Sequence, residues 1–317
     1  MTRILAFLAL LLAPLAAHAQ DWPVKPVRMI VPFAAGGSTD LAARLVAEYL
    51  SRAFGQQVYV ENRTGANGVI GIEAAAKSEP DGYTILVAPD AIASNPHVYK
   101  VNYALKDLAP VVQLSRQPIV LAAHPSLGAK TLPELIALAK REPGLRYGTG
   151  SGVGSSQHME VQWYAQLAGI ELEQVPYRGG GQAINDLIAG HVKLGALGST
   201  PLIPHYKAGK LLLLAQTTEA RAQSLPDVPT FQEAGIKGLV LDQWLGIFVP
   251  AGVPAAIVAR LNAETGKALN DAAIRKSFSD SALEPVGGSA DAFAQLVRED
   301  YAKYERLVRE LKIKAQQ

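Results

Sequence analysis

Four short segments, rich in glycine and small hydroxyl residues, are the part of this sequence best suited to bind a ligand. They read FAAGGSTD (33–40), YGTGSGVGSSQH (147–158), YRGGGQA (177–183) and LGSTPLIPH (197–205), and each lies between a strand-like and a helix-like segment. A helix begins with unpaired backbone N–H groups and a partial positive charge. Glycine lets a ligand approach the backbone, and Ser or Thr adds a hydroxyl donor. The segments therefore predict a site for a small anion.

One such segment alone would more often be a plain turn between strand and helix, because helices favour Ser, Thr or Asp at their start. Four of them favour a shared ligand cleft at the carboxyl ends of the strands. Carboxylate is favoured over phosphate as the ligand group. The sequence has no G-x-x-x-x-G-K-[ST] motif, and no G-x-G-x-x-G motif is followed at the right distance by an acidic residue.

The usual signatures of catalysis and metal binding are missing from the sequence. It has no G-x-S-x-G or H-E-x-x-H motif, no pair of histidines at helical spacing, no cysteine and no obvious carboxylate pair. Each isolated histidine is expected to be a capping or surface residue. His158, which lies in a glycine-rich segment, is the histidine of most interest. We therefore expect no catalytic residue, no bound metal and no cofactor.

The composition is that of an exported globular protein. The 317 residues are 49% hydrophobic and 18% charged, and the net charge of +2 is spread along the chain without a basic stripe for nucleic acid. Residues 1–19 read as a cleaved signal peptide, with Arg3, an apolar segment and the small residues AHA. The alternative is an uncleaved membrane anchor. No later segment is apolar for long enough to span a bilayer. With the signal peptide, this leads us to expect a periplasmic protein. We also expect it to be a monomer.

The elements that must position the four segments follow a repeated pattern of strand and helix. A strand is predicted at 27–33 and a helix at 40–55, and the alternation continues to a final helix from residue 290. This pattern predicts an α/β fold with parallel, doubly wound sheets. The chain length and the break in the pattern predict two domains.

Two apolar segments, at 118–125 and 242–250, are predicted to cross between the domains. The first domain would then be discontinuous and the second continuous. The predicted ranges are 20–121 with 246–317 for the first domain and 122–245 for the second. The final helix is charged on one face, so we expect it to be solvated on that face and packed on the first domain.

Several blocks of the mature chain resemble the periplasmic solute receptors of tripartite tricarboxylate transporters, also called Bug receptors. The blocks include VRMIVPFAAGGSTDLAARLVAEYL, VENRTGANGVIGIEAAAKSEPDGYTIL, YGTGSGVGSSQHMEVQWYAQLAGI, VPYRGGGQAINDLIAGHV and WLGIFVPAGVP. The resemblance implies a two-domain type II periplasmic-binding-protein fold with two hinge crossings. It also implies a small carboxylated ligand (a dicarboxylate, an amino acid or an aromatic acid) and delivery to a membrane permease. Two alternatives stay open, a sensory receptor for a membrane kinase and an exported α/β enzyme acting on small acids.

In this family one ligand carboxylate is typically held by backbone groups and bridging waters at the first glycine-rich segment and neighbouring loops. Carried over to this chain, the resemblance implies ligand-binding residues in all four segments. From the first they are Phe33, Ala35, Gly36, Gly37, Ser38, Thr39 and Asp40. From the others they are Ser151, Gly152, Gly154, Ser155, Ser156, His158, Tyr177, Arg178, Gly179 and Ser199.

The loop after TILVAP also faces the cleft in this family, and here it begins with Asp90 and Ala91. A carboxylate near an anion site is costly unless the ligand also carries a cation. Asp90 is therefore expected either to pair with a ligand ammonium or to cap a short helix at 91–99. Arg178 is either the partner of a second carboxylate or a surface residue. Trp244 either lines the cleft or belongs to the core.

Overall fold

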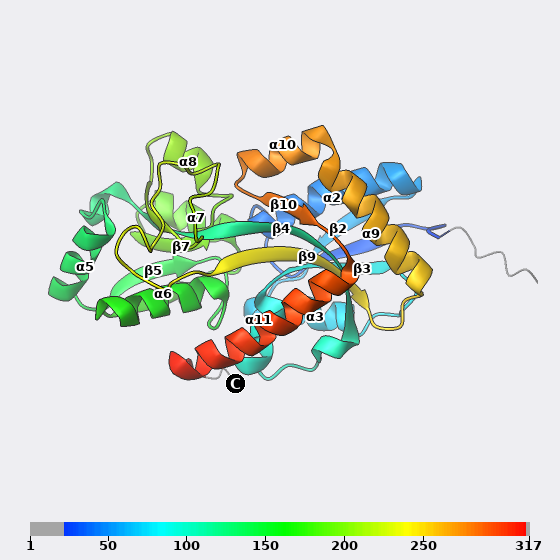
Figure 1. The fold of residues 1–317 in the computed structure, drawn as a ribbon, viewed down its shortest axis with the longest axis horizontal. Coiled ribbons are helices and arrows are strands. Elements are labelled where there is room, and N and C mark those ends of the chain that lie inside the picture. The colour runs from blue at the N-terminus through cyan, green and yellow to red at the C-terminus, as the bar shows by residue number, and fades with distance from the viewer. Residues whose placement is uncertain (1–21, 315–317) are drawn as a thin grey trace, which may run out of the picture.

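The computed structural model describes residues 22–314, so the predicted signal peptide lies outside the described residues. The described chain forms two lobes that lie side by side and are joined by two long strands (Figure 1). These crossing strands are β4 (Leu108–Ala123) and β9 (Asp242–Pro250), which pair antiparallel with each other. Of the two apolar segments predicted to cross between the domains, 242–250 coincides with β9, and 118–125 overlaps the end of β4 as far as Ala123. The exact domain boundaries stay a prediction.

The first lobe is built on three parallel strands. They are β1 (Val27–Val31), β2 (Val58–Asn62) and β3 (Thr84–Pro89). Five helices belong to this part of the fold: α2 (Ser38–Phe54), α3 (Val69–Ala76), α4 (Ala91–Ser94), α9 (Ala255–Asn270) and α10 (Ala272–Asp280). The core forms because the apolar residues of β1, such as Met29, meet the apolar face of α2, including Val46 and Leu50, and all three are fully buried.

The second lobe repeats the arrangement with another parallel set. Its strands are β5 (Leu145–Thr149), β6 (Leu172–Pro176) and β7 (Leu194–Gly198), and β8 (Leu212–Gln216) pairs with β4. Its helices are α5 (Leu132–Arg141), α6 (Ser156–Ala168), α7 (Gly180–Ile188) and α8 (Ile203–Lys207). Tyr147, Tyr164 and Phe231 are among the largest fully buried side chains of its core.

One sheet runs through both lobes in the order β2-β1-β3-β9-β4-β7-β5-β6. The strands within each lobe are parallel, as the sequence predicts. The crossing strands, in contrast, run antiparallel to their neighbours β3 and β7, which the strand–helix alternation does not reveal. This arrangement places the carboxyl ends of β1, β3, β5 and β7, and therefore the glycine-rich segments, at the junction of the lobes.

The final helix, α11 (Ala290–Glu310), contacts both lobes rather than the first alone. Phe293 and Val297 pack in a first-lobe cluster with Trp244, whereas Tyr304 and Leu307 belong to the second-lobe core. With 21 residues the helix is about 32 Å long, long enough to reach across the junction. Figure 1 shows it, in red, running beneath both lobes.

Three further features differ from the sequence-based expectations. Strand β4 begins at Leu108, well before the predicted residue 118, because a stretch with alternating polar residues and Pro110 still pairs with β9. Helix α10 and the short strand β10 (Glu284–Gly287), which pairs with β4, were not expected. Within residues 22–314, no helix is both long and apolar enough to cross a membrane.

Candidate functional site

A small cavity, with about 30 Å³ of space open to the centres of water-sized molecules, lies where the two lobes meet. Three of the four glycine-rich segments supply a large part of its wall, and the remaining one, 177–183, contributes Gly180. Among the described residues that line the cavity, none carries a charged side chain. The lining consists of Phe33, Ala34, Gly37, Ser38, Thr39, Pro89, Gly150, Ser151, Gln157, Gly180, Leu197, Gly198, Pro201 and Gln243.

Helix α2 points its N-terminus at the cavity. Gly37 is its N-cap residue. Because glycine has no side chain, it offers no hydrogen-bond acceptor to the N–H groups of Ser38 and Thr39 in the first turn. Gly36 has a φ of +89°, a left-handed conformation in which a side chain would be strained. The glycine pair therefore turns the chain sharply after β1 and exposes the helix end to a ligand.

Asp40 supports this turn instead of lining the cavity. Its carboxylate accepts hydrogen bonds from the Gly36 N–H (3.2 Å), Arg44 Nε (3.0 Å) and Asn62 Nδ2 (3.0 Å). Burial raises the pKa of Asp40, but the hydrogen bonds and the Arg44 charge outweigh it and hold the pKa below its usual value. The carboxylate is thus saturated by hydrogen bonds within the protein and does not line the cavity.

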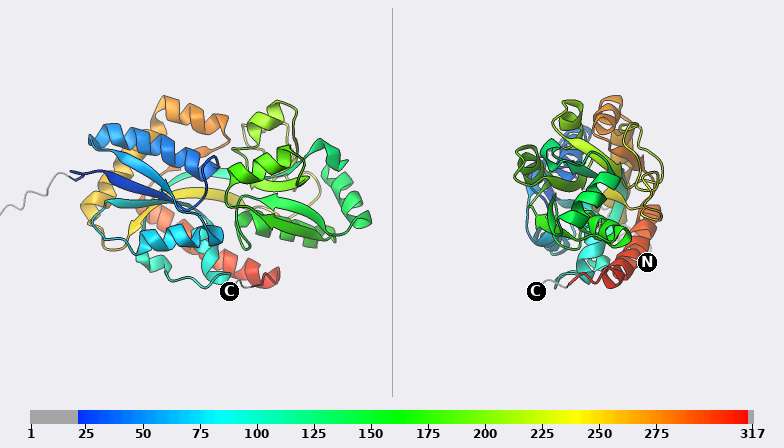
Figure 2. Two further views of the ribbon diagram at one scale, coloured as in Figure 1. Left: turned by 180° about the vertical axis from the view of Figure 1, so that it is seen from behind. Right: turned by 90° about the vertical axis from the view of Figure 1, so that its left-hand side faces the viewer.

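Helix α7 of the second lobe faces α2 across the same cavity. Its N-cap, Gly179, also makes no side-chain cap. The backbones touch at this point: the Ala34 N–H donates to the Arg178 carbonyl (3.2 Å), and a Cβ built on Gly37 would lie 3.5 Å from the Gly180 nitrogen. Seen from behind, the blue α2 and the green second-lobe segments meet at this junction (Figure 2). Two positive helix ends are therefore directed at one small volume.

The third helix at the site, α6, is capped by the protein itself. The Ser155 hydroxyl accepts from the His158 N–H (3.3 Å), and His158 Nδ1 accepts from the Gly154 N–H (3.0 Å). Burial lowers the pKa of His158 to about 4, so the imidazole is neutral near pH 7. His158 does not line the cavity, and its hydrogen bonds match the capping alternative.

Two glutamines that the sequence analysis did not single out supply the side-chain amides of the site. Gln157 Oε1 accepts from the Gly150 N–H (2.9 Å). Gln243, on the crossing strand β9, accepts from Gln117 Nε2 on β4 (2.8 Å) and donates to the Ser156 hydroxyl (3.4 Å). The only signal for Gln117 and Gln243 in the sequence is a polar residue at the edge of an apolar strand, which is too common to indicate a site.

Asp90 faces the final helix and not the cavity. Its side chain is buried, with the residue 1% exposed, and the Tyr304 hydroxyl donates to its Oδ2. It makes no side-chain cap on α4, and it is not a lining residue. Burial, aided by the nearby charge of Asp300, raises the pKa of Asp90 to about 6. Neither role expected from the sequence matches this geometry. The partner that the sequence could not indicate, Tyr304, is more than 200 residues away in the chain.

Trp244 matches the core alternative. It is 3% exposed and packs against Phe248 and Phe293, with ring centroids 6.2 and 5.2 Å away. Its indole Nε1 donates to Asp300 Oδ2 at 2.5 Å, which anchors the crossing strand β9 to α11.

The remaining expected residues surround the cavity without lining it. The Tyr177 hydroxyl donates to Asp186 (2.6 Å), the Arg178 side chain is exposed, and the Ser199 N–H donates to the Pro118 carbonyl (3.2 Å). Of the residues implied by the resemblance, those that line the cavity are Phe33, Gly37, Ser38, Thr39 and Ser151. Those that do not line it are Ala35, Gly36, Asp40, Asp90, Ala91, Gly152, Gly154, Ser155, Ser156, His158, Tyr177, Arg178, Gly179 and Ser199.

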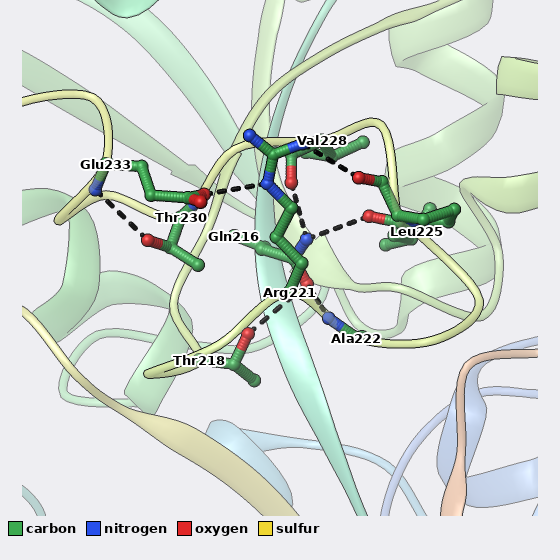
Figure 3. Close-up of polar contacts among 9 residues, drawn as sticks. Gln216, Thr218, Arg221, Ala222, Leu225, Val228, Thr230 and Glu233 are labelled. Atoms are coloured by element: carbon green, nitrogen blue, oxygen red, sulfur yellow. Dashed lines mark hydrogen bonds and ion pairs between the residues drawn. The ribbon is translucent and has the colours of Figure 1, made fainter.

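A second, larger hollow lies beside the crossing strands, between the loop at 218–224 and the α10–β10 segment. Figure 3 shows how its loop is held: Gln216 Nε2 donates to the Val228 carbonyl (2.7 Å), and Arg221 Nε donates to Glu233 (2.8 Å). Arg116 on its wall pairs with Glu284 (2.7 Å). Arg116 and Arg221 are thus paired with carboxylates of the protein, whereas Arg275, which also lines this hollow, makes no ion pair within the described residues.

Comparison with known proteins finds relatives that match over most of the chain. Residues 42–313 match the family model described as "Tripartite tricarboxylate transporter family receptor". Protein BugT of Bordetella pertussis is 35% identical over 321 residues, which cover 98% of each chain. An R. palustris protein solved with adipate is 31% identical, with a TM-score of 0.89, and the match covers 93% of this chain and 100% of that one.

MatC of Rhodopseudomonas palustris, solved with bound malate, is 30% identical with a TM-score of 0.85, and the match covers 90% of this chain and 100% of that one. Proteins of this family are periplasmic solute-binding receptors and not enzymes. The likeness extends over nearly the whole described chain, including both lobes and the segments at their junction. This protein belongs to the tripartite tricarboxylate transporter receptor family.

Proposed function

We propose that this protein captures a small carboxylated molecule in the periplasm, by closure of its two lobes, and delivers it to the permease of a tripartite tricarboxylate-type transporter. One observation carries the proposal. The uncapped N-termini of α2 and α7 face each other across a cavity whose described lining residues include no charged side chain. A carboxylate between them would accept hydrogen bonds from backbone N–H groups of both lobes.

The same geometry supplies a reason for closure. Each helix N-terminus is equivalent to roughly half a positive charge, so two ends brought together repel each other. An anion between them turns that repulsion into attraction to a shared ligand. Because the two ends belong to different lobes, the complete site exists only when the lobes are together. A carboxylate therefore binds the closed form better and shifts the protein towards it.

The lining narrows the class of ligand. No carboxylate lines the cavity among the described residues, because Asp40 and Asp90 are both turned towards other protein groups. A ligand ammonium would thus lack an ionic partner, which favours dicarboxylates and other acids over amino acids. The related structures with adipate and malate support the same class. Gln157 and Gln243 can hydrogen-bond neutral polar parts of such a ligand.

Delivery to a permease and location in the periplasm rest on the family and on the signal-like sequence of residues 1–19. Deletion of the gene in a strain that grows on the identified acid should then abolish uptake of that acid at low concentration. Uptake that continues unchanged would contradict delivery, while binding by the purified protein could still be intact.

Binding itself is tested by thermal unfolding of the purified protein with malate, adipate, succinate, glutamate and benzoate in turn. An acid at 100 times its dissociation constant should raise the free energy of unfolding by about 2.7 kcal/mol. Calorimetry then gives the affinity. The uncharged diamide of the best acid is the matched control and should give no shift. An equal shift by the diamide would overturn recognition of the carboxylate.

A further inference from the structure

A loop of the second lobe is held by the first lobe at three consecutive residues. The Gly152 N–H donates to Asn67 Oδ1 (3.0 Å), and the Tyr99 hydroxyl donates to the Val153 carbonyl (2.8 Å). Gly154 lies against Val98, so closely that a Cβ on this glycine would be 2.4 Å from a methyl group. Asn67 and Tyr99 lie in the first lobe, whereas the loop follows β5 of the second. These contacts therefore bridge the lobes.

The Asn67 side chain is fixed in position before it meets the other lobe. Its backbone has φ 53° and ψ 34°, a left-handed conformation that asparagine adopts more readily than most residues. Its Nδ2 donates to Asn95 Oδ1 (2.8 Å), and Asn95 Nδ2 donates back to the Asn67 carbonyl (3.0 Å). Both residues are buried. The reciprocal pair leaves Asn67 Oδ1 directed at the loop.

Tyr99 complements Asn67 by donating where Asn67 accepts. Burial raises the pKa of Tyr99 to about 12, so its hydroxyl keeps its proton at neutral pH and can donate to a carbonyl. The two side chains thus hold an N–H group and a C=O group of adjacent residues. Such paired contacts fix both the position and the orientation of the loop backbone.

The loop matters because it continues the wall of the cavity. Gly150 and Ser151, immediately before Gly152, line the anion site, and neither Asn67 nor Tyr99 does. The lobes also touch through the Ala34–Arg178 backbone hydrogen bond, and the Thr200 hydroxyl donates to the Ser281 carbonyl (3.0 Å). The Asn67–Tyr99 contact is thus one of several contacts between the lobes near the cavity. It differs from the others in that two first-lobe side chains hold consecutive residues of one second-lobe loop.

We propose that Asn67 and Tyr99 form a closure latch: they are positioning residues that hold the loop at 151–154 on the first lobe and so set ligand affinity without touching the ligand. The effect on affinity rests on the proposed function, because it assumes that the closed form binds. The effect on closure does not. Each neutral hydrogen bond lost should lower the ratio of closed to open molecules about three- to tenfold. The apparent dissociation constant rises in proportion as the closed fraction falls.

The test measures the distance between the lobes directly. The chain has no cysteine, so Glu79→Cys near α3 and Gln166→Cys on α6, both at exposed positions, accept nitroxide labels selectively. Pulsed electron-spin resonance then gives the distance distribution without ligand and with malate or adipate. Wild type is expected to show a short-distance component that grows with any acid that binds.

The test variants are Tyr99→Phe and Asn67→Gly. The first removes only the hydroxyl, and the second removes the acceptor at a backbone conformation that glycine adopts without strain. Tyr147→Phe is the matched control, because the Tyr147 hydroxyl accepts from Gln162 Nε2 (3.1 Å) within the second lobe. Each test variant should lose about three- to tenfold in the closed-to-open ratio, and the control should not.

If the short-distance component of Tyr99→Phe equalled that of wild type, the latch would be overturned. It would also be overturned if wild type showed no short-distance component either without or with the acids. Failure of the proposed function looks different. In that case no carboxylate would stabilise the wild type, while the variants would still lose the short component in ligand-free protein.

Discussion

Gly37 at the start of α2 and Gly180 at the start of α7 bring the two lobes into backbone contact. A Cβ on Gly37 would lie 3.5 Å from the Gly180 nitrogen, and one on Gly36 would lie 3.7 Å from the Gly181 Cα. At Gly37 and Gly36 these are ordinary contact distances. The fit is tighter at Gly181 and Gly179, where a Cβ would lie 2.7 Å from the Ala35 carbonyl oxygen and 2.8 Å from the Ala34 Cβ of the other lobe. The glycines therefore determine how closely the lobes can approach, whereas the helix N–H groups supply the chemistry of the site.

Gly181→Ala should hinder closure while leaving the fold intact. A Cβ at Gly181 would lie 2.7 Å from the Ala35 carbonyl oxygen in the other lobe. Within α7 itself, alanine is a better helix former by up to about 1 kcal/mol. We expect the free energy of unfolding of the ligand-free protein to be unchanged or higher, and the affinity for the identified acid to fall at least about tenfold, as calorimetry would show.

Gly266→Ala in α9 is the matched control for this change. It is also a glycine inside a helix, but a Cβ added there would meet no other part of the described chain within 4 Å. Its affinity should equal that of wild type. If Gly181→Ala bound the acid as well as Gly266→Ala does, the glycine contact would have no part in closure.

A carboxylate supplied by the protein should block the site. Ser38→Asp places an acid in the first turn of α2, where Ser38 lines the cavity. An aspartate at a helix N-terminus is favourable for stability, so the variant should fold normally. The new carboxylate should also occupy the proposed anion site or repel the ligand anion. Thermal unfolding should therefore show no stabilisation by malate or adipate. Ser289→Asp at the N-cap of α11 makes the same change away from the cavity.

The ligand response of Ser289→Asp should match that of wild type. A Ser38→Asp protein that still responds to the acid at wild-type concentrations would show that the ligand carboxylate binds elsewhere. The N-terminus of α7 would then be the better candidate for binding the ligand carboxylate.

The sequence could indicate where the proposed anion site lies, because the signal for a helix N-terminus is local. Glycine and hydroxyl residues between a strand and a helix determine a helix N-terminus within a few residues, and Gly37, Ser38 and Thr39 line the cavity as expected. The parallel strands of each lobe were predictable for the same reason, since an apolar run and an amphipathic helix are both read from neighbouring residues.

What the sequence could not reveal depends on distant partners. Asp90 is turned from the cavity by Tyr304, and Gln243 meets Gln117 only because β4 and β9 pair across the lobes. Nothing near Asn67 indicates that its amide reaches Gly152 in the other lobe. Local patterns predicted the ends of helices well, but contacts between elements more than 80 residues apart required the three-dimensional structure.

Asp90 should make the stability of the protein depend on pH. Burial raises its pKa from 3.8 to about 6 in the folded state, with Asp300, Lys303 and Tyr304 of α11 as its charged and titratable neighbours. A raised pKa means that the folded protein favours the protonated acid. The resulting stability is fully present below about pH 4 and is lost as the pH rises through about 6.

Asp90→Asn removes this titration, so its free energy of unfolding relative to wild type should rise between pH 4 and 7, by up to about 3 kcal/mol. Urea unfolding at several pH values measures the difference. Asp40→Asn should behave in the opposite way, because its lowered pKa stabilises the fold above its unfolded pKa and this stability is lost on acidification. Equal pH dependence of the two variants would contradict the assigned environments.

Gly152→Ala offers a test of the latch by steric conflict. Its Cβ would lie 2.6 Å from the Tyr99 hydroxyl oxygen and 3.1 Å from the Asn67 Cβ, both in the other lobe. Closure should therefore be disfavoured, and the short interlobe distance should diminish. In a Tyr99→Ala background the obstructing hydroxyl is gone, so the same glycine substitution should have much less effect.

The four proteins of this set (wild type, each single variant and the double variant) form a double-mutant cycle. Because Tyr99 and Gly152 are in contact only when the lobes are closed, their coupling in the closed-to-open ratio should be large. Their coupling in the free energy of unfolding of the open, ligand-free form should be near zero. Additive effects on the interlobe distance would mean that the two residues do not meet in the closed protein, and the latch would then have no structural basis.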